Sequence, residues 1–161
     1  MRSMRMALAA AVTLAFLAPS GGTQEVSGVH PFYQYANLMP AGFNPPGLGG
    51  LGFLGNDGVI ATWGGSQKTA GEIWIIPGLA GASAPGIPVR IDGPLREPLG
   101  LRVVDGVIYV LTKPELLKYT RQANGSWTRS TVAKGWAYND DQWHHFAFSL
   151  IHHNGAFYFN T

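Results

Sequence analysis

A hairpin pattern that occurs three times constrains the fold of this 161-residue chain more than any other feature. Each copy has a strand-like run, a tight turn, and a second run rich in β-branched or aromatic residues. We place the turns at Asp57-Gly58, Asp105-Gly106 and Asn154-Gly155, because such dipeptides favour the positive φ angles of two-residue hairpins. Gly58 to Gly106 is 48 residues and Gly106 to Gly155 is 49. A hairpin repeating at this period is typical of propeller blades.

The remainder of each repeat supplies further strands. Residues 73–76 read as a strand after the first hairpin, and two strands flank Asn124-Gly125 after the second. Four strands are the usual content of a blade. We therefore predict an all-β fold with blades at about residues 49–97, 98–145 and 146–161, the last incomplete. A single antiparallel sandwich is the alternative, although it gives no reason for the regular spacing.

Three repeats do not close a ring. Propellers have about four to eight blades, and closure protects the edges of their sheets. The third repeat reaches Thr161 after one hairpin, whereas six or more such blades need on the order of 300 residues. We expect this chain to be the N-terminal part of a larger protein whose remaining blades are missing here. The alternative is a truncated remnant that is marginally stable or dependent on partners.

The N-terminus has the pattern of a signal peptide. Arg2 and Arg5 precede the apolar residues 6–18, and small residues follow. This thirteen-residue stretch falls short of the roughly 20 residues that span a bilayer. We predict a signal peptide at residues 1–22 and a Pro/Gly-rich lead-in at residues 23–48. The mature protein would be secreted or periplasmic, with no membrane span after cleavage.

Composition excludes several classes of function. Charged residues make up 12% of the chain and the formal net charge is +2, with Lys and Arg scattered, so the sequence does not predict a nucleic-acid partner. There is no cysteine, which excludes disulfides, thiolate zinc sites and iron–sulfur clusters. Adjacent histidines diverge on a strand, so we predict no metal site from them. We place His152 and His153 in the third turn, exposed to solvent.

Two segments resemble a known family. Residues 97–119, "EPLGLRVVDGVIYVLTKPELLKY", resemble a blade of the glucose/sorbosone dehydrogenase-like β-propellers, which are related to the soluble quinoprotein sugar dehydrogenases. Residues 144–149, "HHFAFS", are similar to the "His-Glu-Phe-Ala-Phe-Gly" run of many members. The resemblance implies oxidation of a sugar or polyol by hydride transfer to pyrroloquinoline quinone (PQQ), with bound calcium. Quinoproteins follow their histidine with "Gln-Ser-Gly-Arg", which this chain lacks, and the family's cofactor and calcium ligands fall beyond Thr161.

The resemblance assigns the general base of the reaction to His144. An imidazole titrates near neutral pH, which suits removal of a hydroxyl proton, and Asp140 or Asp141 could orient the ring. Trp136 and Trp143 could stack on a sugar ring, or equally fill the wedge between blades. A structural histidine, hydrogen-bonded to a neighbouring loop, is the alternative for His144. The rival function is a non-catalytic propeller that binds carbohydrate or protein, because fold alone does not decide function.

Overall fold

The computed structural model describes residues 38–45, 47–63, 71–81, 83–138 and 147–160. They belong to one compact unit, Asn37–Thr161. The predicted signal peptide and most of the lead-in lie outside the described residues. Within the described ranges the fold is all-β, as predicted, with strands and turns and no helix.

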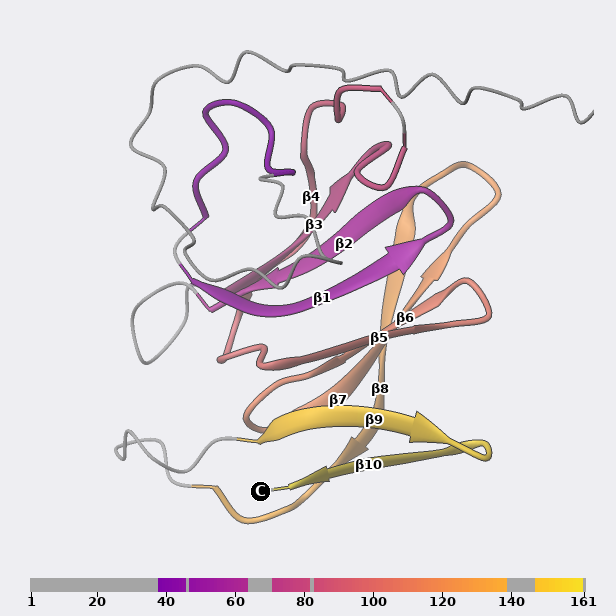
Figure 1. Ribbon diagram of the computed structural model, residues 1–161. Coiled ribbons are helices and arrows are strands. Elements are labelled where there is room, and N and C mark those ends of the chain that lie inside the picture. Colours follow the sequence, from indigo (N-terminus) through magenta and orange to yellow (C-terminus); the bar gives the residue numbers. More distant parts are fainter. Residues whose placement is uncertain (1–37, 46, 64–70, 82, 139–146, 161) are drawn as a thin grey trace, which may run out of the picture. The chain divides into compact units, whose positions relative to one another are not determined.

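Ten antiparallel strands form three sheets, each in chain order (Figure 1). The first and second sheets have four strands each, and the third is a two-stranded hairpin. The strands are β1 (Leu48–Leu54), β2 (Asp57–Thr62), β3 (Gly71–Ile76) and β4 (Val89–Leu95); β5 (Gly100–Val104), β6 (Val107–Leu111), β7 (Glu115–Arg121) and β8 (Trp127–Lys134); and β9 (Phe148–His153) and β10 (Ala156–Asn160).

The first hairpin turn lies two residues earlier than we predicted. Asp105-Gly106 and Asn154-Gly155 are turns with positive φ at both residues, as type I′ requires. In the first sheet, however, Asp57 already pairs with Leu54, so the turn is Gly55-Asn56. Gly55 has φ +61°, which fits the first central position of a type II′ turn. Aligned on these turns, the repeats are 50 and then 49 residues long.

A threonine at the end of β2 and another directly after β6 join the second strand of each four-stranded sheet to the third strand. The Thr62 hydroxyl accepts a hydrogen bond from the Glu72 amide (3.1 Å) and donates one to the Glu72 carbonyl (3.4 Å). The Thr112 hydroxyl makes the same two bonds with the backbone of Glu115, at 3.3 and 2.8 Å. Each hydroxyl thus satisfies both backbone groups where the chain enters a new strand. The repeat therefore extends to individual hydrogen bonds.

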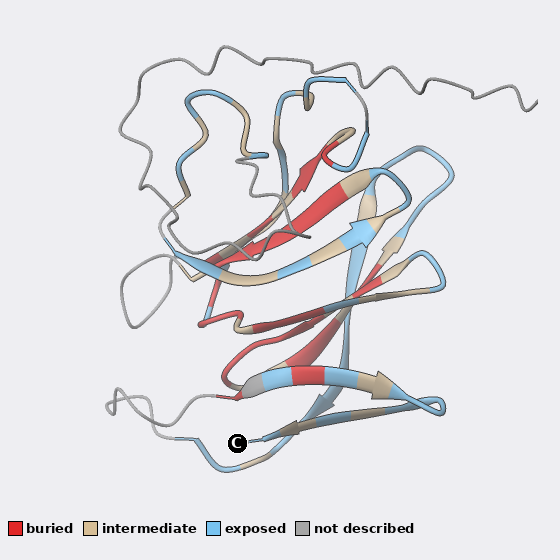
Figure 2. Cartoon of the chain, viewed as in Figure 1, coloured by how far each residue is buried: buried red, intermediate tan, exposed pale blue. Residues whose placement is uncertain are grey.

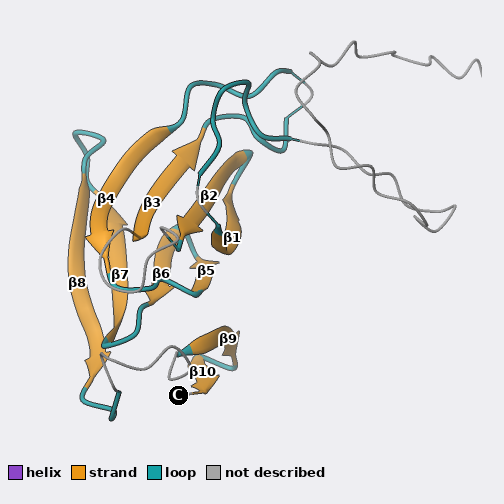
Figure 3. Cartoon of the chain, turned by 90° about the vertical axis from the view of Figure 1, so that its left-hand side faces the viewer, coloured by secondary structure: helices purple, strands orange, loops and turns teal. Residues whose placement is uncertain are grey.

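The first strands of successive sheets lie side by side at close range. Figure 3 shows β1, β5 and β9 along one side of this unit, with β4 and β8 along the other. A Cβ on Gly50 would stand 2.7 Å from Cβ of Leu101, and a Cβ on Gly100 would stand 2.9 Å from Cβ of Leu150. These positions are equivalent in the turn-based alignment. Glycine is needed there because no side chain fits between the strands.

The second sheet buries apolar side chains on both of its faces. Figure 2 shows buried residues, in red, along the strands of the first two sheets. One cluster lies between the first and second sheets and a second between the second sheet and the β9–β10 hairpin. A smaller cluster covers the other face of the first sheet, where Met39 and Phe43 pack against Ile60. A single two-sheet sandwich does not fit this stack of three sheets. The first cluster includes Val59, Ala61, Ile73, Leu101, Val110 and Tyr119; the second has Leu111, Leu116, Ala147 and Leu150.

Candidate functional site

Most of the predicted site falls within residues 139–146, which precede β9 in the sequence. His144, Asp140, Asp141 and Trp143 fall outside the described residues, so their proposed roles stay predictions. This segment is flanked on both sides by described residues. Trp136 before it and Ala147 after it pack in the same apolar cluster. Trp136 and Ala147 therefore both lie in the cluster between the second sheet and the β9–β10 hairpin.

Trp136 has a clear packing role. Its indole Nε1 donates a hydrogen bond to the carbonyl oxygen of Lys113 (2.8 Å). Its ring lies 4.9 Å from that of Phe159, with the two planes inclined by 57°, and the side chain is half-buried. A sugar could contact only the exposed part of this ring. The sugar-stacking role of Trp136 stays a prediction. Trp127 also has a packing role, since it lies partly buried against the core between the first two sheets.

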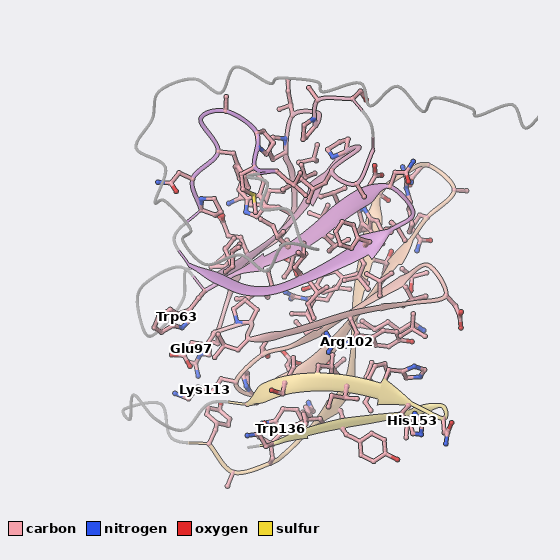
Figure 4. The ribbon with its side chains drawn as sticks, in the orientation of Figure 1. Trp63, Glu97, Arg102, Lys113, Trp136 and His153 are labelled. Carbon is pink, nitrogen blue, oxygen red and sulfur yellow. The ribbon has the colours of Figure 1, made fainter. Side chains whose placement is uncertain are left out.

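A buried ion pair adjoins Trp136, and sequence reasoning did not find it. Lys113 Nζ lies 3.4 Å from Glu97 Oε2, and the two side chains are 3% and 2% exposed. They come from the segments that precede β5 and follow β6. Figure 4 shows them pointing toward each other on the same side as Trp63. The attraction between an ammonium group and a carboxylate is stronger in such a low-dielectric setting than in water. Each group thereby offsets part of the free energy that burial of the other costs.

Backbone geometry positions this pair. Glu97 has φ +46°, an unfavourable angle for a residue with a Cβ, and it aims the chain into Pro98 and β5. The Lys113 amide donates to the Arg96 carbonyl (3.0 Å). The two ends of the β5–β6 hairpin are thereby joined directly beside Trp136. Two residues of the "EPLGL" segment therefore have structural roles: Glu97 forms an ion pair, and Gly100 allows the close approach of β5 to β9.

A second polar network lies between the first two sheets, away from this ion pair. The Tyr119 hydroxyl donates to Asp92 Oδ2 (2.7 Å), and Arg129 Nη1 donates to the same oxygen (3.1 Å). Tyr119 is 1% exposed. Burial, followed by the hydrogen bond to Asp92, raises the pKa of Tyr119 well above its ordinary value. The network connects β4 to β7 and β8 and reads as structural.

This network predicts a pH-dependent stability. Because the pKa of Tyr119 is raised in the folded protein, its hydrogen bond to Asp92 stabilises the fold in full below about pH 10. Above that pH the tyrosine of the unfolded chain starts to ionise, and the stabilisation declines. We expect Tyr119→Phe to cost about 2 kcal/mol at neutral pH and the difference from wild type to shrink between about pH 10 and 11. Urea unfolding as a function of pH measures this. Tyr158→Phe, at a side chain 55% exposed, is the control. A difference that stays constant with pH would contradict the prediction.

The two histidines that we predicted in the third turn lie instead in the strand before it. His152 and His153 belong to strand β9, and the turn follows them. His153 is exposed. His152 is half-buried, with its ring 4.9 Å from that of Phe157, because the strand alternation turns it towards the second sheet. It is thus a packing residue.

The described residues contain no group of three or more His, Asp or Glu that could hold a metal ion. Nor do they include a helix of the length and apolar character needed to cross a membrane. Comparison of the chain with protein-family models, curated proteins and solved structures finds no match.

Proposed function

We propose that the three sheets are blades of a β-propeller, and that the protein is an exported sugar or polyol dehydrogenase of the quinoprotein type. One observation supports the propeller most strongly. The first strands β1, β5 and β9 lie next to one another, and equivalent small residues, Gly50 and Gly100, make each close approach. Radially arranged sheets bring their first strands together in this way around a central axis.

In this proposal His144 takes the proton from a sugar hydroxyl. The resemblance supplies PQQ as the acceptor of the hydride and calcium as its companion ion, and no described residue is assigned to either. Asp140 or Asp141 orients the imidazole, and Trp136 with Trp143 borders the sugar. Support comes from Trp136, which donates a hydrogen bond to the backbone of Lys113, the residue that forms the buried ion pair with Glu97.

The test is dye-linked oxidation of a panel of aldoses and polyols by the protein supplied with PQQ and calcium. We expect His144→Ala to lower kcat by about 100-fold or more, the usual contribution of a general base. His145→Ala is the matched control, because the family resemblance assigns the base to His144 and no role to its neighbour His145. Its kcat should stay close to that of the wild type.

Two outcomes count against the enzyme. Equal activity of wild type and the His144 variant would show that His144 is not the base. If the wild type oxidises no sugar, yet sugars change its tryptophan fluorescence, the non-catalytic carbohydrate-binding propeller is the better description. Trp136→Phe should then weaken that fluorescence change.

A further inference from the structure

The loop between β7 and β8 carries a sequence pattern that the proposed catalysis does not use. Asn124 is the one asparagine of this sequence with a serine or threonine two residues later, Ser126. The residue between them is Gly125 and not proline. This tripeptide is the acceptor pattern for asparagine-linked glycosylation. It also suits a tight turn, and an acceptor must in addition be accessible at the surface.

The tripeptide lies at the exposed tip of the β7–β8 hairpin. Residues 122–126 are all exposed, and Figure 2 shows this loop in pale blue. None of them belongs to the three apolar clusters. Because the loop joins the ends of two strands, further sheets stacked on the face of this sheet would not cover it. A bulky, hydrophilic group attached here would therefore project into water and leave the packing of the sheets unchanged.

Hydrogen bonds among its own residues hold the loop. The Gln122 amide donates to the Ser126 carbonyl (2.8 Å), and the Gly125 amide donates to the Gln122 carbonyl (2.9 Å). Both the amide and the hydroxyl of Ser126 donate to Asn124 Oδ1, at 3.0 and 2.7 Å. All of these partners lie within one short loop, so it can form as soon as its hairpin does, before the sheets have packed.

The hydrogen bonds of the loop leave the nitrogen of the Asn124 side chain available. Both bonds from Ser126 end on the oxygen Oδ1. Within the described part of the chain, Asn124 Nδ2 makes no hydrogen bond. The side chain is also bonded only to Ser126 of the same loop, so its modification would break no contact between strands.

We propose that Asn124 is the acceptor of an asparagine-linked glycan, which a transferase delivers from a lipid-pyrophosphate-linked oligosaccharide. In this step Nδ2 forms a bond to C1 of the first sugar, and the bond between C1 and the pyrophosphate oxygen breaks. The lipid pyrophosphate leaves with the bonding electron pair, and Nδ2 loses one proton to a base of the transferase. The inference rests on the export of the chain in the proposed function, and not on its catalytic activity.

The test expresses the 161-residue chain in a eukaryotic host in two forms, one with its own N-terminus and one behind a secretion signal of the host. We expect both forms to gain mass that peptide-N-glycosidase removes. That enzyme leaves an aspartate in place of Asn124, which peptide mass spectrometry locates. Asn124→Gln and Ser126→Ala should each abolish the gain, whereas Ser126→Thr should keep it because it keeps the hydroxyl. Circular dichroism checks that the variants are folded.

Asn154→Gln is the matched control. Asn154 also precedes a glycine in an exposed hairpin turn, but Ala156 stands two residues later. This variant should carry the same glycan as the wild type.

The two forms separate this inference from the export on which it rests. The host signal brings the second form into the secretory pathway in any case. A glycan on the second form alone would support the acceptor site and count against export by residues 1–22. If the second form stays unmodified, Asn124-Gly125-Ser126 serves only to form the turn and the proposal is overturned, whether or not the first form is exported. A glycan that Ser126→Ala retains overturns it as well.

Discussion

Replacement of Gly49 by alanine is expected to lower the free energy of unfolding by about 3 kcal/mol, or to prevent folding. A Cβ at this position in β1 would overlap the carbonyl oxygen of Pro98 and stand 3.0 Å from its carbonyl carbon. Backbone atoms cannot rotate aside as the end of a side chain can. The first strand must then separate from the start of the second sheet, which opens the cluster between them. For a domain stable by only about 5–15 kcal/mol, this is a large loss.

A graded series of glycine variants isolates this cause. Gly100→Ala meets the Leu150 side chain and amide at 2.9 and 3.0 Å, so its cost should be smaller than that of Gly49→Ala. Gly42→Ala meets nothing within 4 Å but has φ +79°, so it should cost only about 1 kcal/mol of backbone strain. Chemical denaturation of the three proteins gives the order. Equal costs at positions 42 and 49 would show that the close approach of the sheets does not matter.

Replacement of Lys113 by methionine is the second large effect, with an expected loss of about 3 kcal/mol. It removes the ammonium group 3.4 Å from Glu97 Oε2, in a place where both side chains are almost fully buried. The remaining carboxylate keeps its desolvation cost without this opposite charge. Lys134→Met, at an exposed position in β8, is the control and should change stability by less than about 0.5 kcal/mol.

A double-mutant cycle separates the lost charge from the lost packing. Glu97→Gln replaces the carboxylate with a neutral amide of the same shape. The double variant Glu97→Gln, Lys113→Met should therefore be more stable than Lys113→Met alone, by about 1 kcal/mol or more. Thermal or urea unfolding of the four proteins completes the cycle. Strictly additive effects would mean that the two charges do not interact.

The hairpins and the strands that follow them could be predicted from the sequence because their signals are local. Asp105-Gly106 and Asn154-Gly155 are turns, and β7 and β8 flank Asn124-Gly125 as expected. The first turn was misplaced because two adjacent dipeptides both suit a hairpin. Gly55-Asn56 forms the turn, and the Asp57 carboxylate accepts a hydrogen bond from the Gly78 amide (2.8 Å).

The polar contacts could not be predicted, because they join residues that only the stacked sheets bring together. Glu97 and Lys113 lie on different segments of one hairpin, and nothing in their sequence context marks them as buried. Asp92 meets Tyr119 and Arg129 across two sheets. The site residues His144, Asp140, Asp141 and Trp143 were predicted from the loop sequence and the family resemblance, and their roles are predictions still.

The equivalence of Gly50 and Gly100 has a consequence for how such a chain can change in length. Residues 50–99 contain one entire unit, and the chain enters and leaves it at matching points of successive sheets. A tandem duplication of this stretch would join sheets through the same threonine hydrogen bonds and the same leucine-on-glycine contacts that the chain already makes. A deletion of the stretch would likewise leave equivalent strands next to each other. Recombination could therefore add or remove about fifty residues at once without inventing a new core.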